Sequence, residues 1–121
     1  MLLARALFSD PELLILDEPA SGLDLPSREL LLEALGSAAA TSSSRTTLVA
    51  THHLEEVAPS TTHAALLRGG QLVTSGPVHR VLTAEMLEAC FGIPVEVGRR
   101  GRGWWAAAVD RASPGPRGPR R

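Results

Sequence analysis

The sequence contains no lysine, and all twelve of its basic residues are arginines. A phosphate-binding loop of the pattern GxxxxGK[ST] holds a nucleotide through backbone N–H groups and a lysine that reaches the phosphates. None of the 121 residues can supply that lysine. Its absence therefore excludes a self-contained nucleotide site of this kind from the chain.

Cysteine and long hydrophobic runs are also scarce. The single cysteine, Cys90, has no second cysteine with which to form an internal disulfide, which favours a reducing compartment. No run approaches the roughly 18–20 consecutive apolar residues that cross a bilayer. The apolar N-terminal segment is interrupted by Arg5 and Asp10, so it lacks the form of a secretory signal. We therefore expect a cytoplasmic protein that reaches a membrane only through a partner.

Charge is distributed unevenly along the chain. Residues 1–98 carry five arginines against twelve acidic residues, a net charge of −7, whereas residues 99–121 carry seven arginines against one aspartate, a net charge of +6. Residues 111–121 are mostly Pro, Gly and Arg, and they are predicted to form a disordered tail. A basic tail can bind nucleic acid or anionic lipid. We expect no nucleic-acid partner, because no aromatic or helical pattern organises these charges.

Hydrophobic periodicity predicts an α/β fold in the first half of the chain. Residues 1–7 have helical spacing, and residues 13–16 form an uninterrupted apolar run typical of a strand covered on both faces. Asp24 can cap a second helix that extends to about Ala39. A strand over residues 47–51 follows. The order strand, helix, strand predicts a right-handed βαβ unit with parallel core strands.

The second half is predicted to add a hairpin, a helix and a short strand pair. The hairpin turns at Gly69 and Gly70, because glycine supplies the positive φ angles that tight turns need. We expect this hairpin to join the same sheet. The expected elements are a short helix over 52–58, hairpin strands over 64–67 and 72–74, a helix over 78–91, and strands over 95–97 and 104–109.

Two neighbouring carboxylates, Asp17 and Glu18, follow the first strand. In open α/β sheets, ligands bind beyond the carboxyl ends of the strands, so both side chains stand where a ligand would be held. Mg2+ takes oxygen ligands and is typically held by one or two carboxylates together with substrate phosphates, a role that suits Asp17. Successive strand residues point to opposite sides, so Glu18 could orient or deprotonate a water for in-line attack on a phosphoryl group.

This segment resembles the Walker B segment of ABC-type ATPases, in which an apolar run precedes Asp17-Glu18-Pro19. Two further motifs follow in the family's order. The next residues resemble its D-loop, which lies across the dimer interface: Ser21-Gly22-Leu23-Asp24. The segment at the end of the next strand resembles its switch-histidine segment: Thr51-His52-His53-Leu54-Glu55-Glu56-Val57.

The resemblance implies a nucleotide site that uses ATP and Mg2+. It assigns Mg2+ binding to Asp17, the catalytic carboxylate to Glu18, and contact with the terminal phosphate and the attacking water to His52. It also implies that the D-loop residues take part in binding the nucleotide between two subunits. The resemblance further implies a partial P-loop NTPase-like three-layer fold, a second ATP-binding subunit, and transmembrane permease subunits on the inner face of a membrane.

The motifs that precede Walker B in this family are absent from the chain. These are the P-loop, the glutamine loop and the signature motif. Residues 1–110 are therefore expected to be the C-terminal part of an ABC-type ATPase domain, inactive without a missing N-terminal half. The alternative is a non-catalytic remnant or interaction module that pairs with another chain. The transported substrate, the direction of transport and the permease are not encoded in these motifs.

One short sequence, Leu67-Arg68-Gly69-Gly70-Gln71, contains the Gly-Gly-Gln of the family's signature. It follows the switch histidine and leads into a strand, whereas the signature opens a helix upstream of Walker B. We therefore interpret it as a hairpin turn.

Overall fold

A computed structural model describes residues 12–41 and 45–110 of the chain. The chain forms two compact units, Met1–Thr61 with Arg100–Trp104 and Thr62–Arg99 with Trp105–Arg121. The helix predicted over residues 1–7 and the tail predicted over 111–121 lie outside the described residues. The domain boundaries given above therefore stay a prediction.

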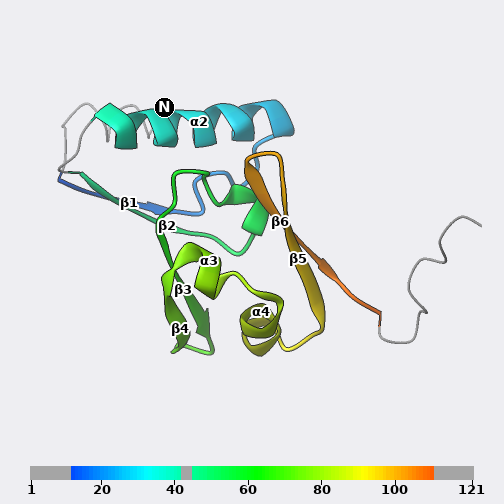
Figure 1. Cartoon of the computed structure of the whole chain (residues 1–121). Helices are drawn as coiled ribbons and strands as arrows, with labels where there is room; N and C mark the ends of the chain where they lie inside the picture. Colours follow the sequence, from blue (N-terminus) through cyan, green and yellow to red (C-terminus); the bar gives the residue numbers. More distant parts are fainter. Residues whose placement is uncertain (1–11, 42–44, 111–121) are drawn as a thin grey trace, which may run out of the picture. The chain divides into compact units, whose positions relative to one another are not determined.

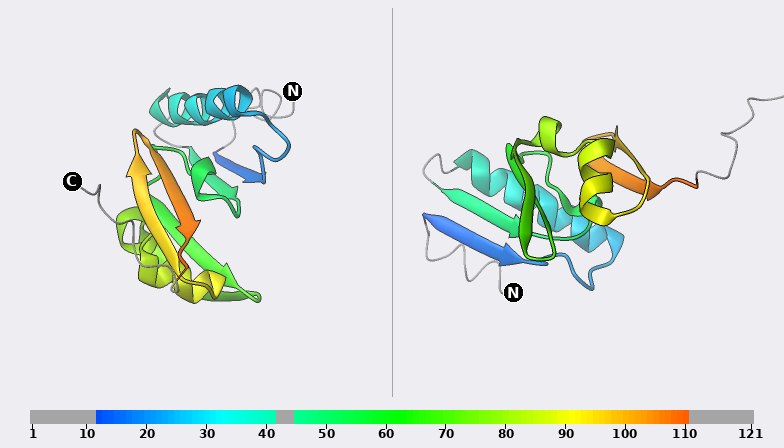
Figure 2. Two further views of the ribbon diagram at one scale, coloured as in Figure 1. Left: turned by 90° about the vertical axis from the view of Figure 1, so that its right-hand side faces the viewer. Right: turned by 90° about the horizontal axis from the view of Figure 1, so that it is seen from below.

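The first unit is built on two parallel strands joined by a helix. Strand β1 (Leu13–Asp17) pairs with strand β2 (Thr46–Ala50), and Leu13 lies opposite Thr46 while Asp17 lies opposite Ala50. Helix α2 (Leu25–Thr41) connects the strands and lies along one face of the pair (Figures 1 and 2). This arrangement confirms the predicted strand, helix, strand order with parallel strands.

Helix α2 begins where the sequence predicted. The Asp24 carboxylate accepts a hydrogen bond of 2.9 Å from the backbone N–H of Ser27, which satisfies one of the free donors of the first turn. Hydrogen bonding by the side chain of Ser27, and also by its backbone N–H, lowers the pKa of Asp24 below its ordinary value. Leu32 and Leu35 on the helix are buried, as is Leu14 on β1. These leucines belong to the small apolar core of this unit.

The other face of the β1–β2 pair is open, which corrects the expectation of a strand covered on both faces. Leu13 and Ile15 remain 55% and 63% exposed, and Leu48 remains 57% exposed. Side chains alternate across a strand, and Ile15 is paired with Leu48, so the three share one face. Among the described residues, no helix other than α2 covers this strand pair, and α2 covers only one of its two faces.

The predicted hairpin is present in the second unit. Strands β3 (His63–Arg68) and β4 (Gln71–Pro77) pair antiparallel, and both Gly69 and Gly70 have positive φ angles, 56° and 76°. This geometry confirms that the Gly-Gly-Gln sequence forms a turn. The expectation that the hairpin extends the first sheet is wrong: among the described residues, the six strands form three separate two-stranded sheets.

The helix predicted over 78–91 is broken into two. Helix α3 (Val78–Val81) and helix α4 (Ala84–Phe91) are separated at Thr83, whose hydroxyl accepts a hydrogen bond from the backbone N–H of Met86. Thr83 thus caps a new helix instead of continuing the old one, since its side chain competes for backbone donors. Gly92 ends α4 in the left-handed conformation, as predicted.

The final strand pair consists of β5 (Val95–Arg100) and β6 (Gly103–Ala108). Trp104 is buried and Trp105 is half-buried. A Cβ atom at Gly98 would lie 2.8 Å from the indole nitrogen of Trp105, so no side chain fits at position 98 unless the ring shifts. None of the helices within the described ranges is both long and apolar enough to cross a membrane.

The capping geometry of α2 predicts the effect of Asp24→Ala. The variant is expected to lower the melting temperature by a few degrees at neutral pH, because a backbone N–H loses its acceptor, whereas Asp24→Asn keeps the acceptor and most of the stability. The folded-state pKa of Asp24 is lowered, so its contribution is present above the unfolded value of 3.8 and is lost as the pH falls below it. Thermal melts at neutral pH and below pH 3.8 check both statements. An equal deficit at both pH values would contradict the carboxylate cap.

Candidate active site

The site lies where the two parallel strands of the first unit end. Glu18 follows β1 and His52 follows β2 by two residues, so both stand at the carboxyl edge of the pair. The backbone N–H of Glu18 donates to the carbonyl of Ala50 at 2.8 Å, which extends the parallel ladder by one hydrogen bond. The pairing thus brings together two residues that are 34 positions apart in the sequence.

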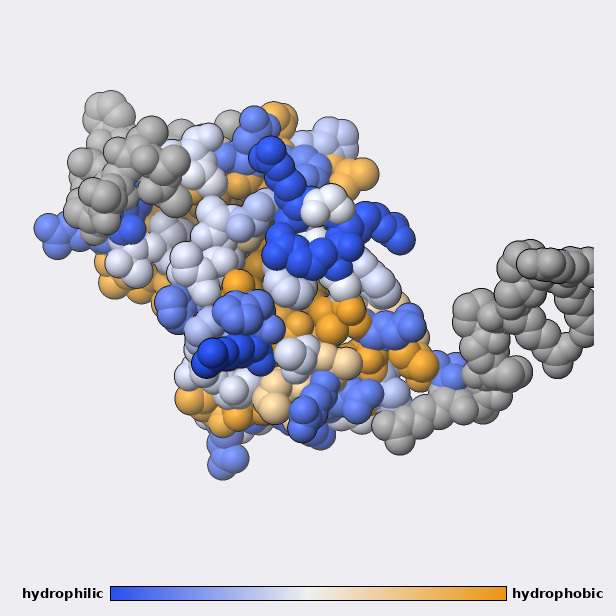
Figure 3. Space-filling view, in the orientation of Figure 1, coloured by the Kyte–Doolittle hydropathy of each residue, from blue (hydrophilic) through white to orange (hydrophobic). Residues whose placement is uncertain are grey.

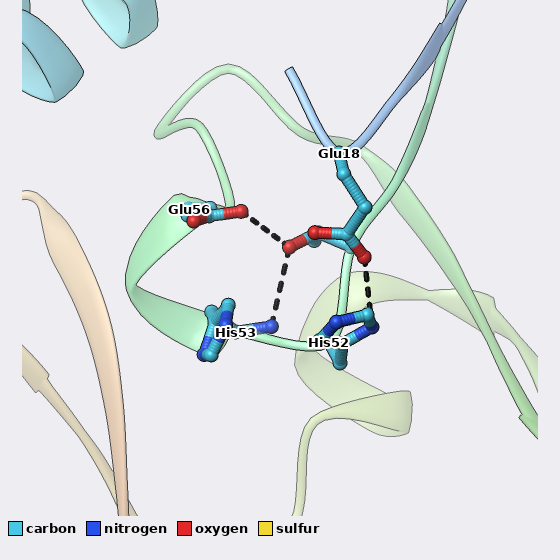
Figure 4. Close-up of polar contacts among 5 residues, drawn as sticks. Glu18, His52, His53 and Glu56 are labelled. Atoms are coloured by element: carbon cyan, nitrogen blue, oxygen red, sulfur yellow. Dashed lines mark hydrogen bonds and ion pairs between the residues drawn. The ribbon is translucent and has the colours of Figure 1, made fainter. Parts of the chain in front are cut away.

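Glu18 and His52 are in direct contact. The Nδ1 atom of His52 lies 2.7 Å from Oε1 of Glu18 (Figure 4). The contact is a hydrogen bond when the imidazole is neutral and an ion pair when it is protonated. This juxtaposition of a carboxylate and an imidazole was expected from their assigned roles at one site.

The two side chains differ in exposure. The Glu18 side chain is 25% exposed, whereas that of His52 is 74% exposed. With Nδ1 engaged by Glu18, the Nε2 atom of His52 is the ring nitrogen left for a ligand. A carboxylate next to an accessible imidazole can accept a proton from a water while the imidazole contacts an anionic group.

The backbone of Glu18 is strained. Its φ angle is +49°, and no other non-glycine residue in the described part of the chain has a positive φ angle. The left-handed conformation brings a side-chain Cβ close to the following carbonyl oxygen, at a cost of about 1–2 kcal/mol. The carbonyl of Glu18 accepts a hydrogen bond from the N–H of Ser21 at 3.1 Å, which holds the strained turn. Such strain is found where the surrounding structure fixes a functional side chain.

Asp17 is the last residue of β1 and is exposed. By alternation along the strand it shares a face with Leu13 and Ile15, not with Leu14. No three acidic, histidine or cysteine side chains converge to hold a metal ion within residues 12–41 and 45–110. The single carboxylate of Asp17 fits a hard cation such as Mg2+ that takes its other oxygens from phosphates and water.

The residues that resemble a D-loop lie between β1 and α2, and all four are exposed: Ser21, Gly22, Leu23 and Asp24. Gly22 has a φ of 78°, and the N–H of Leu23 donates to the carbonyl of Ala20 at 3.1 Å. The carboxylate of Asp24 is engaged as the cap of α2. The hydrogen bonds of these residues within the chain stabilise the turn and the start of the helix. Their part in a nucleotide site stays a prediction.

Two further residues adjoin the site, although no individual role was predicted for them from the sequence. Thr51 and Glu56 are joined by a hydrogen bond of 2.5 Å from the threonine hydroxyl to Oε2 of Glu56. The same hydroxyl accepts a hydrogen bond from the N–H of His53 at 3.2 Å. A threonine that bonds the backbone two residues ahead is a recognised local pattern, but the partnership with Glu56 depends on burial, which one sequence does not reveal.

Comparison with known proteins relates the sequence to ATP-binding proteins of ABC transporters. The sequence matches no protein-family model. It is 45% identical over 96 residues to the uncharacterized ABC transporter ATP-binding protein YlmA of Bacillus subtilis, which covers 79% of this chain and 36% of YlmA. It is 39% identical over 83 residues to Nod factor export ATP-binding protein I of Cupriavidus metallidurans, which covers 69% of this chain and 27% of that protein.

The structure agrees with these sequence similarities. It superposes on a solved structure of an ABC transporter in an inward-facing conformation with a TM-score of 0.73 and 28% sequence identity. The match covers 91% of this chain and 45% of that chain. The chain spans little more than a third of the length of curated relatives such as YlmA.

The strained conformation of Glu18 predicts an unusual order of stability for two variants. Glu18→Gly is expected to be more stable than Glu18→Ala by about 1 kcal/mol, because both lose the carboxylate but only alanine keeps the strain of a positive φ. At an ordinary strand end the order would be reversed, since glycine is the more flexible residue in the unfolded chain. Urea unfolding of the two variants measures the difference. A more stable Glu18→Ala would show that the turn at Glu18 is unstrained.

Proposed function

This chain belongs to the ABC transporter ATP-binding proteins, to which about four-fifths of it is related, and we propose that it forms the Walker B, D-loop and switch-histidine part of their ATP site. The contact between Glu18 and His52 is the observation that carries the proposal. The activity proposed is hydrolysis of ATP coupled to transport across a membrane.

Glu18 and His52 have complementary roles in this proposal. The Glu18 carboxylate accepts a proton from a water whose oxygen attacks the terminal phosphorus of ATP. The bond between that phosphorus and the bridging oxygen breaks, and the electron pair leaves with ADP. His52 contacts the terminal phosphate through the ring nitrogen that faces away from Glu18, and it keeps the carboxylate in place through the 2.7 Å contact.

Asp17 is the residue that would hold Mg2+. The ion, when bound with ATP, neutralises part of the phosphate charge. Asp17 stands one residue before Glu18, on an exposed strand end that a bound nucleotide can reach. The separate positions of the two carboxylates allow one to serve the ion while the other serves the water.

Other polypeptide segments must supply the rest of the ATP site. The chain has no lysine and therefore no P-loop, and its relatives are more than twice as long. We propose that a segment with a P-loop and a signature motif completes the three-layer domain. A second ATP-binding subunit would meet this chain at the exposed D-loop residues, and permease subunits would hold the assembly on the cytoplasmic face of a membrane.

A second candidate function is favoured by the open face of the β1–β2 pair. Leu13, Ile15 and Leu48 leave an apolar surface that water disfavours. Figure 3 shows that hydrophobic residues lie at the surface among hydrophilic ones. The chain could accordingly act as a non-catalytic module that pairs with another chain through this face.

Complementation in trans tests the ATPase proposal. The chain alone is expected to hydrolyse ATP no faster than its Glu18→Gln variant, because it lacks a P-loop to bind the phosphates of the nucleotide. Mixing it with the N-terminal segment of YlmA is expected to produce Mg2+-dependent phosphate release, provided that this segment carries the P-loop and signature.

Two matched variants of the mixture separate the site from the fold. Glu18→Gln and His52→Ala should lower the turnover about 100-fold or more, since removal of a general base or a charge-stabilising group typically costs that much. His53→Ala is the control, because His53 takes part in the hydrogen bonds around His52 through its backbone N–H and carbonyl and not through its ring. Equal loss in His52→Ala and His53→Ala would contradict the assignment of His52.

The open face predicts self-association of the isolated chain. The double variant Leu13→Thr with Ile15→Thr should shift the chain toward the monomer, because threonine keeps strand propensity while removing apolar surface. Leu67→Thr with Leu72→Thr is the matched control on an exposed hairpin. Light scattering at several concentrations measures the molar mass. The same shift in both double variants would show that no particular face drives association.

A further inference from the structure

Three hydrogen bonds link Thr51, His53 and Glu56 around His52. The Thr51 hydroxyl donates to Glu56 Oε2 at 2.5 Å and accepts from the N–H of His53 at 3.2 Å (Figure 4). The N–H of Glu56 donates to the carbonyl of His53 at 3.1 Å. His52 therefore lies between two residues, Thr51 and His53, that are hydrogen-bonded to each other and are each hydrogen-bonded to Glu56.

Glu56 is an anchor for this loop because it is buried. Its exposed fraction is 7%, and no other charged residue in the described part of the chain is buried. Leu54, on the same short helix η1 (Leu54–Glu56), is also buried at 8%. A buried carboxylate is costly unless it is hydrogen-bonded, so the Thr51 hydroxyl and the Glu56 carboxylate hold each other in place.

We propose that Thr51 and Glu56 are positioning residues that fix the main chain of His52, so that its imidazole is held against the Glu18 carboxylate. Neither side chain bonds the imidazole itself. The Thr51 hydroxyl bonds the N–H of the peptide group that follows His52, and the Glu56 carboxylate bonds that hydroxyl. The consequence for catalysis rests on the proposed function, whereas the geometry of the loop can be tested without ATP.

Glu55 provides a natural comparison for Glu56. It has the same side chain, lies on the same helical turn, and is half-exposed where Glu56 is buried. A general effect of negative charge near His52 would be lost with either residue. An effect of the hydrogen bond to Thr51 would be lost with Glu56 alone.

Nuclear magnetic resonance of the full chain without nucleotide tests the proposal. Glu18→Gln first identifies how the imidazole signals of His52 change when its partner is altered. Thr51→Val and Glu56→Leu should then move the His52 signals as well. Thr51→Val removes the acceptor of the His53 N–H, so it should also speed hydrogen exchange of that amide about fivefold, the loss expected for one hydrogen bond. Thr51→Ser and Glu56→Gln retain the hydroxyl and an acceptor, so both should resemble the unmodified chain, as should Glu55→Leu.

The outcomes separate this proposal from the assignment of the reaction. Unchanged His52 signals in Thr51→Val and Glu56→Leu, with unchanged His53 exchange in Thr51→Val, would overturn the positioning role, whatever the ATPase assay shows. If Thr51→Val does not fold by circular dichroism, Glu56→Leu tests the same bond from its other end. A change of the same size in Glu55→Leu would also overturn the proposal, because it would show an effect of charge and not of the hydrogen bond.

Discussion

The parallel pairing of β1 and β2 is the constraint on which the candidate site depends. Parallel strands end at the same edge of a sheet, so the residues that follow each strand meet there. Asp17 lies opposite Ala50, and the hydrogen bond from Glu18 to Ala50 extends this register by one residue. A slip of one residue would place every side chain of the strand on the other face and separate Glu18 from His52.

The order of the elements along the sequence was enough to predict this pairing, because a local residue pattern marks each element. The apolar run at Leu13, the cap at Asp24 and the glycine turn at Gly69 were all confirmed. The break of the long helix at Thr83 was missed, since threonine occurs both inside helices and at their caps. The choice between the two depends on packing around the helix, which a single sequence does not show.

The sequence predicted which two side chains meet at the candidate site, but it did not predict the contacts that support them. The contact between Glu18 and His52 follows from the motifs, because both were expected at one strand edge. The positive φ of Glu18 and the burial of Glu56 were not predictable. Glutamate ordinarily avoids both situations, so only the three-dimensional structure reveals that two glutamates of this chain are held against their preferences.

The open apolar face and the proposed ATP site are connected through β1. Leu13, Ile15 and Asp17 alternate onto one face of that strand, whereas Leu14 is buried toward the other. A polypeptide that covers Leu13 and Ile15 would therefore end its contact beside Asp17, the carboxylate proposed to hold Mg2+. The exposed apolar surface is thus continuous with the carboxylate that we propose to hold Mg2+. One additional segment, packed on this face and carrying a phosphate-binding loop at its end, would satisfy both requirements.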